Sequence, residues 1–155
     1  MDDRLKVLYI ERDPMSWKSS EVQKAYAKTL YAVREALSRR FDVRCEMNLL
    51  QVPDEKILSG GFNILLTHLQ EDPGDDAFFK YGKSIEKLKG LKEKKPDLRI
   101  IVYTGAIQDF LYPIQSEKWA SAIVRKRPAW ELKDSIEELN KSIDDVVAEI
   151  RGRKA

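Results

Sequence analysis

Residues able to do acid–base or phosphate chemistry cluster directly after three short apolar runs of the sequence. They are Glu11, Arg12, Asp13, Thr67, His68, Thr104 and Gly105. Carboxylates bind Mg²⁺ or move protons, imidazole titrates near neutrality, and a hydroxyl group can bind phosphoryl oxygens. His68 is the only histidine, and neither a serine-centred nucleophile motif nor a glycine-rich phosphate loop accompanies it. The chemistry of these residues therefore depends on whether the fold brings the three clusters together.

The apolar runs themselves predict strands. Residues 5–10, 62–67 and 98–104 are rich in branched and aromatic side chains, which is typical of strands buried on both faces. Residues 42–47 alternate apolar and charged side chains, and residues 121–125 form a short run followed by basic residues. These two patterns favour strands at the edges of a sheet.

Helical patterns occupy the intervals between the runs. The first helix begins either at Asp13, with Pro14 as the first helical residue, or at Ser20, which forms a capping box with Gln23. We favour the Asp13 start only as a bent or irregular first turn. The later helices are predicted at residues 53–58 as a weak turn, at about 78–94, at about 107–120, and from 128 to about 150.

This alternation predicts one α/β domain over residues 1–155. Its expected architecture is a flavodoxin-like three-layer sandwich around a five-stranded parallel sheet of order 2-1-3-4-5. In that order the first, third and fourth strands are neighbours, and ligands bind at their carboxyl ends. We therefore expect the three polar clusters to share one edge of the sheet.

Composition excludes several classes of protein. The chain has 155 residues, 43% of them hydrophobic, and a net charge of +2, which fits one domain and predicts neither a nucleic-acid nor a membrane partner. Cys45 is the only cysteine, which excludes a multi-cysteine zinc site and favours a cytoplasmic protein. The sequence has neither a signal-peptide pattern nor a membrane-span pattern. It also lacks the dinucleotide-binding and P-loop motifs, and we expect no cofactor and no metal.

From residue 5 to about 150, this layout resembles the receiver domain of two-component response regulators. Thr104 followed by Gly105 is similar to the hydroxyl residue and small follower that bind the phosphoryl oxygen in receivers. Receivers also carry a lysine directly before a proline ahead of the last helix. Here Arg127 precedes Pro128 in that register, and Lys126 stands one residue early.

The resemblance fails at the residues that carry the receiver's chemistry. Receivers end their first strand with a pair of acids that hold Mg²⁺, and here Arg12 follows Glu11. The receiver's phosphate-accepting aspartate ends the third strand, where this chain has Thr67 with His68 next. The resemblance therefore implies a degenerate pseudo-receiver that does not accept phosphate. Its expected remnant pocket comprises Glu11, Arg12, Asp13, Thr67, His68, Thr104, Gly105, Lys126 and Arg127.

Two alternatives to this function stay open at the sequence level. One is a small-ligand or nucleotide-binding enzyme that uses the same sheet edge, through Thr67, His68 and the acidic segment 71–76. The other is a receiver that takes phosphate on a displaced acid such as Asp72. An enzyme is the less favoured class, because no partner nucleophile accompanies His68.

The last predicted helix indicates a protein partner or a homodimer. Its apolar residues recur at steps of four and three, and at about 1.5 Å per residue the helix exceeds the length of a six-residue strand. We expect its last turns to overhang the sheet and to meet a second subunit or another protein. The candidate interface residues are Trp119, Trp130, Ile143, Val146 and Ile150.

Overall fold

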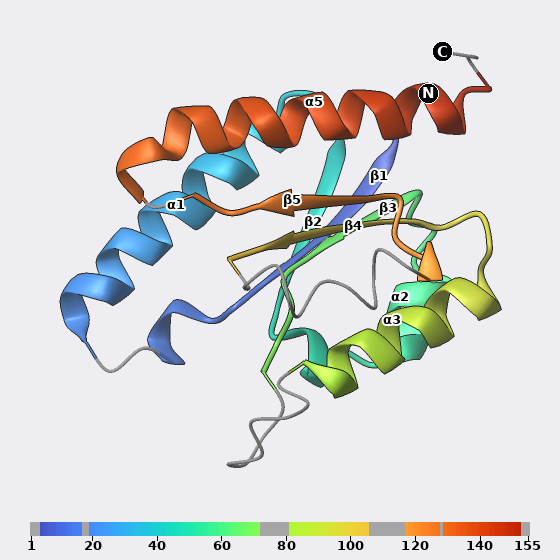
Figure 1. Ribbon diagram of the computed structural model, residues 1–155, viewed down its shortest axis with the longest axis horizontal. Helices are drawn as coiled ribbons and strands as arrows, with labels where there is room; N and C mark the ends of the chain where they lie inside the picture. The colour runs from blue at the N-terminus through green and yellow to red at the C-terminus, as the bar shows by residue number, and fades with distance from the viewer. Residues whose placement is uncertain (1–3, 17–18, 72–80, 106–116, 128, 153–155) are drawn as a thin grey trace.

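The computed structural model describes residues 4–16, 19–71, 81–105, 117–127 and 129–152. Five parallel strands form one sheet of order β2-β1-β3-β4-β5, which confirms the predicted topology (Figure 1). The strands are β1 (Lys6–Glu11), β2 (Asp42–Met47), β3 (Ile64–Thr67), β4 (Arg99–Thr104) and β5 (Ala122–Arg125). Across the described residues, no helix combines the length and apolar character needed to cross a bilayer.

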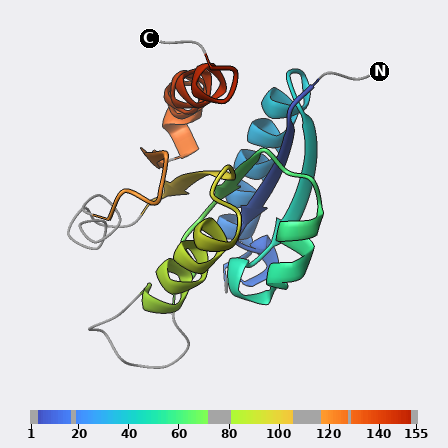
Figure 2. The same cartoon turned by 90° about the vertical axis from the view of Figure 1, so that its right-hand side faces the viewer.

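Helices cover both faces of the sheet. They are α1 (Ser20–Ser38), α2 (Asp54–Ser59), α3 (Gly82–Lys94) and α5 (Leu132–Ile150), with the 3₁₀ turns η1 (Pro14–Ser16), η2 (Leu49–Gln51) and η4 (Ala129–Glu131). Figure 1 shows α1 and α5 on one face and α2 and α3 on the other, and Figure 2 shows α5 nearly end-on. The helix predicted at 107–120 falls largely outside the described residues.

The central strands are buried on both sides, as their apolar runs predict. In β1, Val7 and Tyr9 belong to the core under α1 and α5, whereas Leu8 and Ile10 belong to the core under α2 and α3. Successive strand residues point to opposite faces, so one continuous apolar run supplies both cores. The buried carboxyl end of β1 thereby fixes the position of Glu11.

The two predicted start signals of the first helix lie in separate elements, and the cap of the α-helix is one residue earlier than predicted. The Asp13 carboxylate accepts a hydrogen bond from the Met15 backbone N–H (2.9 Å) at η1. The α-helix begins later, and its N-cap is Ser19, whose hydroxyl accepts from the Val22 N–H (3.4 Å), rather than Ser20. The bent first turn is therefore a short 3₁₀ element, and α1 itself starts at Ser20.

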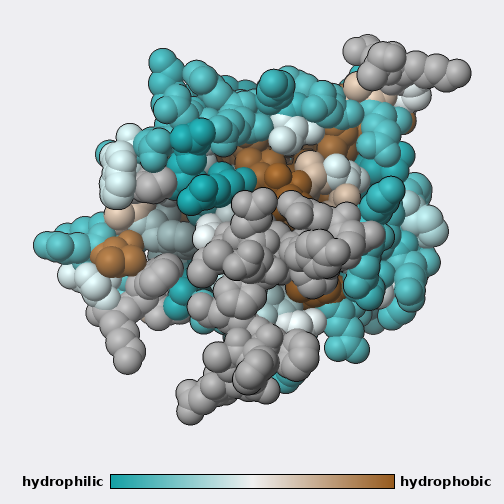
Figure 3. All heavy atoms as spheres, in the orientation of Figure 1, coloured by the Kyte–Doolittle hydropathy of each residue, from teal (hydrophilic) through white to brown (hydrophobic). Residues whose placement is uncertain are grey.

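The apolar stripe of α5 packs inward, which corrects the predicted interface. Ile143 and Val146 are buried in the core, and Ile150 is half-buried against it. Near the end of the helix, Glu149 pairs with Arg99 at the start of β4 (3.1 Å). Hydrophilic side chains follow the outer side of α5 (Figure 3). Trp119 is also buried, in the core on the α2 and α3 side, so Trp130 is the one fully exposed residue among the five predicted interface residues.

Two glycines provide a matched test of this packing. A Cβ at Gly60 would overlap the Phe62 ring and lie 3.0 Å from the Lys56 carbonyl oxygen, whereas a Cβ at Gly90, inside α3, would meet nothing within 4 Å. We expect Gly60→Ala to lower the free energy of unfolding by about 1–3 kcal/mol. Gly90→Ala should raise it by about 0.5–1 kcal/mol, because alanine favours the helix. Urea denaturation measures both, and equal effects of the two substitutions would contradict this packing.

Candidate functional site

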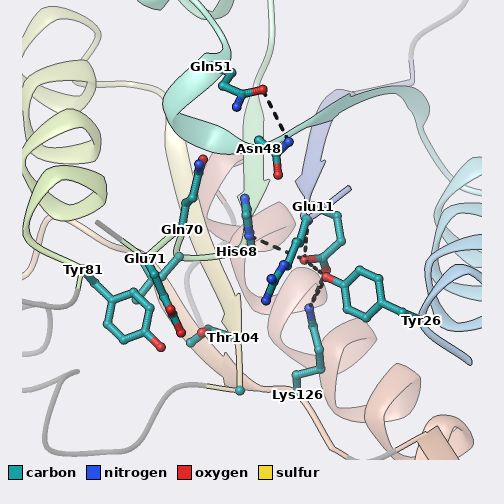
Figure 4. Close-up of a pocket in the computed structure, with 13 residues that line it drawn as sticks. Glu11, Tyr26, Asn48, Gln51, His68, Gln70, Glu71, Tyr81, Thr104 and Lys126 are labelled. Atoms are coloured by element: carbon teal, nitrogen blue, oxygen red, sulfur yellow. Dashed lines mark hydrogen bonds and ion pairs between the residues drawn. The ribbon is translucent and has the colours of Figure 1, made fainter. Parts of the chain in front are cut away.

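A polar cavity of about 450 Å³ opens at the carboxyl edge of the sheet. β1 contributes Glu11 and Arg12, the end of β3 leads into His68, and β4 contributes Thr104. Figure 4 shows the side chains that line the cavity. The lining residues are Glu11, Arg12, Tyr26, Asn48, Gln51, His68, Leu69, Gln70, Glu71, Tyr81, Thr104, Gly105 and Lys126. The edge predicted from the topology therefore carries a cavity lined mainly by polar and charged residues.

The Glu11 carboxylate is the centre of a buried hydrogen-bond network. Its Oε2 accepts from the Lys126 ammonium (2.6 Å) and from the Tyr9 hydroxyl (3.2 Å). Its Oε1 accepts from the Tyr26 hydroxyl (2.5 Å) and from the Arg12 backbone N–H (3.1 Å). In Figure 4, Tyr26, His68 and Lys126 all point toward this carboxylate. One anion thus joins β1, α1 and the residue that follows β5.

This network keeps Glu11 ionised although only 3% of it is exposed. Burial by itself raises the pKa of the carboxyl group, but the nearby Lys126 charge and the hydrogen bonds outweigh burial, so its pKa lies below the usual value. Burial and then the Glu11 charge raise the pKa values of Tyr9 and Tyr26, so both phenols stay protonated. Both hydroxyls can therefore donate to Glu11.

His68 is a neutral histidine held by the backbone. Its Nε2 accepts a hydrogen bond from the Leu49 N–H (3.1 Å), so the ring proton resides on Nδ1, which lies 3.9 Å from Glu11 Oε1. Burial lowers the pKa of His68 from 6.5 to about 4; the Glu11 charge opposes this shift, and the Lys126 and Arg12 charges add to it. The imidazole therefore fixes the η2 turn to the end of β3 and carries no charge at neutral pH.

Six of the nine predicted pocket residues line the cavity, and three do not. Thr67 is fully buried, and its hydroxyl donates to the His68 carbonyl (2.9 Å) instead of facing the cavity. Asp13 caps η1 and is absent from the lining. The register pairs Ile10 with Thr67, so the residue beside Glu11 at the cavity is His68. The side chain after β3 that faces the cavity is thus one residue later than the position indicated by the resemblance to receivers.

A one-residue shift also corrects the position of the basic residue. Arg127 hydrogen-bonds to Glu131 (3.0 Å) and to Glu138 of α5, and its side chain points away from the cavity. Lys126 donates to Glu11, although the proline register favoured Arg127. Because successive residues of an extended chain point in opposite directions, only one of the two can face the cavity.

The sequence analysis did not identify Tyr26 or the three amide side chains that line the cavity, those of Asn48, Gln51 and Gln70. Tyr26 is one of the residues that recur every three or four positions along the predicted first helix, a spacing that indicates packing against the core. This spacing does not indicate the hydrogen bond that the Tyr26 hydroxyl donates to Glu11. Asn48 has a positive φ of 64° and follows an edge strand. Its Oδ1 accepts from the Asp13 N–H (3.2 Å), and its own N–H donates to the Glu11 carbonyl (2.8 Å). An asparagine after a strand is a recognisable signal for such a backbone conformation.

Tyr26 and Lys126 also line a second, smaller opening. This α1 groove, of about 150 Å³, is bordered by Val22, Ala25, Tyr26, Thr29, Lys126 and Arg127. Lys126 lies 5.2 Å from the centre of the Tyr26 ring, and its ammonium is 3.3 Å from the Tyr26 hydroxyl. The two side chains therefore form a wall shared by the cavity and the groove.

Comparison with solved structures identifies the fold. The receiver domain of RcsB from Escherichia coli, in its non-phosphorylated form, matches with a TM-score of 0.61 at 20% identity, over 98% of this chain and 97% of that chain. A CheY-like receiver domain from Methanospirillum hungatei JF-1 matches with a TM-score of 0.60 at 17% identity, over 94% and 98%. This chain has the receiver-domain fold.

The receiver fold extends over nearly the whole chain. The signal receiver domain of a modulated diguanylate cyclase from Desulfovibrio desulfuricans G20 matches with a TM-score of 0.58 at 16% identity, over 98% of this chain and all of that domain. No family model and no curated protein matches this sequence. At such identities the likeness concerns the fold, so the chemistry has to be argued from the residues of this chain.

The residues of the cavity do not fit the Mg²⁺ ion that ordinary receivers hold. Mg²⁺ requires oxygen ligands in near-octahedral geometry, and proteins usually bind it through one or two carboxylates with free oxygen lone pairs. Both oxygens of Glu11 already accept hydrogen bonds, one of them from a lysine, and the next residue is Arg12. Within the described ranges, no group of three or more His, Cys, Asp or Glu side chains could hold a metal ion. Asp72, the displaced acid considered as an acceptor, lies outside those ranges.

Proposed function

We propose that this protein is a receiver-fold signalling module that does not accept phosphate and acts by contact with another protein. The observation that carries the proposal is His68. It occupies the cavity-facing position after β3, where a receiver presents its acceptor carboxylate. An acyl phosphate forms on a carboxylate, and His68 presents an imidazole instead. The ring is neutral, and its Nε2 already accepts a hydrogen bond from the Leu49 N–H.

The charges around His68 support the same proposal. Phosphoryl transfer needs a cation free to neutralise negative charge as it develops on the transferred group. Here Lys126 is bound to Glu11 in a buried pair, with its side chain 16% exposed. The cavity is thus organised around an internal ion pair, and the fold remains available as a scaffold for contacts on its helical faces. The ligand-binding alternative has a cavity at the expected edge and stays a prediction.

Intact-mass spectrometry after incubation with acetyl phosphate and Mg²⁺ tests the proposal. We expect the wild-type chain to keep its unmodified mass while an ordinary receiver domain, treated in the same tube, gains one phosphoryl group. The reason is that the position after β3 carries the His68 imidazole, and the described carboxylate beside Lys126, that of Glu11, is buried with both oxygens accepting hydrogen bonds. A stoichiometric, hydroxylamine-labile adduct on the wild-type chain would refute the proposal and direct attention to Asp72.

A further inference from the structure

The amide side chains that line the cavity already use their oxygens within the chain. Asn48 Oδ1 accepts from the Asp13 N–H (3.2 Å), and Gln51 Oε1 accepts from Asn48 Nδ2 (3.4 Å). Gln70 Oε1 accepts from the Leu50 N–H (2.7 Å). An amide group carries two N–H donors besides its oxygen. Within the described part of the chain, the NH₂ groups of Gln51 and Gln70 make no hydrogen bond, and both side chains line the cavity.

His68 adds a third donor to the cavity. Its Nε2 accepts from the Leu49 N–H, so the proton is on Nδ1. The nearest acidic oxygen, Glu11 Oε1, lies 3.9 Å from Nδ1, which is too far for a hydrogen bond. Only 6% of His68 is exposed, and a buried N–H without an acceptor destabilises the fold. A ligand atom that accepts from Nδ1 would therefore be bound favourably.

Two of these donors are held rigidly before any ligand arrives. The Gln70 backbone N–H donates to Ser84 Oγ (3.0 Å), and the same hydroxyl donates to the Gln70 carbonyl (2.7 Å). Ser84 belongs to α3 and is fully buried. The Leu50 N–H fixes the Gln70 side chain, and the Leu49 N–H fixes the His68 ring. Binding at these donors therefore costs little conformational entropy.

The charges of the lining favour a ligand with one negative charge at these donors. Glu11 and Lys126 neutralise each other in a buried pair. Arg12 brings a further positive charge to the lining. Glu71, the remaining acid among the described lining residues, is exposed, so solvent and salt screen its charge. Figure 4 shows the Glu71 side chain pointing the opposite way from that of Gln70.

We propose that the cavity binds a small organic carboxylate. Its two oxygens accept from the Gln51 and Gln70 NH₂ groups and from His68 Nδ1–H, and its apolar body packs against Leu69 and Tyr81, which also line the cavity. Hydrogen bonds to an ionised acceptor are stronger than those to a neutral one. The volume of about 450 Å³ suits a small molecule. This site is a binding activity beyond the proposed contact with another protein.

Titration of the full chain with benzoate tests the inference. His68 is the only histidine, so its imidazole NMR signals report directly on the site. Benzoate should shift these signals in a saturable way. Benzamide has nearly the same shape without the charge and should bind more than about tenfold more weakly. Inorganic phosphate, at the same ionic strength, should also bind more weakly because it has no apolar body to pack against Leu69 and Tyr81.

Substitution of one amide by a carboxylate provides the matched variants. Gln70→Glu keeps an oxygen for the Leu50 N–H but replaces the NH₂ donor by a negative charge, so benzoate affinity should fall more than about tenfold. Gln51→Glu makes the same change at an exposed position and should also weaken binding. The control is Asn140→Asp on α5, which keeps an oxygen for Arg40 and should bind benzoate like the wild type.

Several results would overturn the inference. They are an absence of saturable His68 shifts with benzoate, binding of benzamide or phosphate as tight as that of benzoate, and undiminished benzoate affinity in both Gln70→Glu and Gln51→Glu. Thermal melting without ligand shows whether each variant is folded, and Gln51→Glu keeps the test valid if Gln70→Glu does not fold. The acetyl phosphate mass assay tests the proposed function separately, so failure of one proposal leaves the other in place.

Discussion

Replacing Lys126 with methionine is expected to lower the free energy of unfolding by about 3–5 kcal/mol. The substitution keeps the length and apolar body of the side chain but removes the ammonium that lies 2.6 Å from Glu11 Oε2. Glu11 would then be a buried carboxylate without a counter-charge, and its pKa would rise because burial would no longer be opposed by Lys126. Urea denaturation at pH 7 measures the loss.

The double variant Glu11→Gln/Lys126→Met separates charge from packing. The amide of glutamine at position 11 can accept from one tyrosine hydroxyl through its oxygen and donate to the other through its NH₂ group. No buried charge remains, so the double variant should recover a large part of the stability lost by Lys126→Met alone. Lys141→Met, at an exposed position of α5, should change stability by less than about 0.5 kcal/mol. A Lys126→Met protein as stable as Lys141→Met would show that the buried pair contributes nothing.

Acidification is expected to remove about 3 kcal/mol of stability between pH 6.5 and pH 4 through His68 alone. The pKa of His68 is lowered from 6.5 to about 4 in the folded chain. Between those values the unfolded chain binds a proton that the folded chain does not, so stability falls as the pH falls and levels off below about 4. The pKa of Glu11 is also lowered, so its contribution is lost only at more acidic pH.

Unfolding at a series of pH values measures this slope, and His68→Gln provides the control. Glutamine cannot take up the proton, and its amide oxygen can accept the Leu49 N–H in place of Nε2, so the variant should lose the decline between pH 6.5 and pH 4. Because His68 is the only histidine, its imidazole NMR signals can be followed without ambiguity. Titration of those signals near pH 6.5 in the folded protein would disprove the buried, neutral imidazole.

The order of the strands could be predicted from the sequence because burial leaves a local signature. Strands such as β4, buried on both faces, appear as continuous apolar runs, and β2, at the edge, appears as an alternating one. The right-handed crossover rule then leaves few arrangements of five parallel strands. The edge that carries the cavity follows from that order without any knowledge of the side chains.

The site itself could be predicted only to within one residue. His68 instead of Thr67, and Lys126 instead of Arg127, face the cavity. Which of two neighbours turns inward depends on where each strand ends and how the next turn leaves it, and this is decided by tertiary packing. The Tyr26 bond to Glu11 joins positions on different elements, so no local pattern in the sequence encodes it.

Helix α5 was misjudged for a related reason. Its apolar repeat predicts a contact with a second subunit or another protein through Ile143, Val146 and Ile150. The apolar residues of the repeat instead pack into the core of the same chain, with Leu139, Ile143 and Val146 buried. A seven-residue apolar repeat has the same form whether it meets a second helix or a sheet, so the sequence alone could not separate the two.

The wall formed by Tyr26 and Lys126 is shared by the cavity and the α1 groove. Both side chains line both openings, and both bind Glu11 between them. A molecule that displaces either side chain from the cavity changes the shape of the groove at the same time. Linkage requires that binding at the groove then alters affinity at the cavity by the same factor. A small anion that competes with Glu11 for Lys126 would therefore change the shape of the α1 groove.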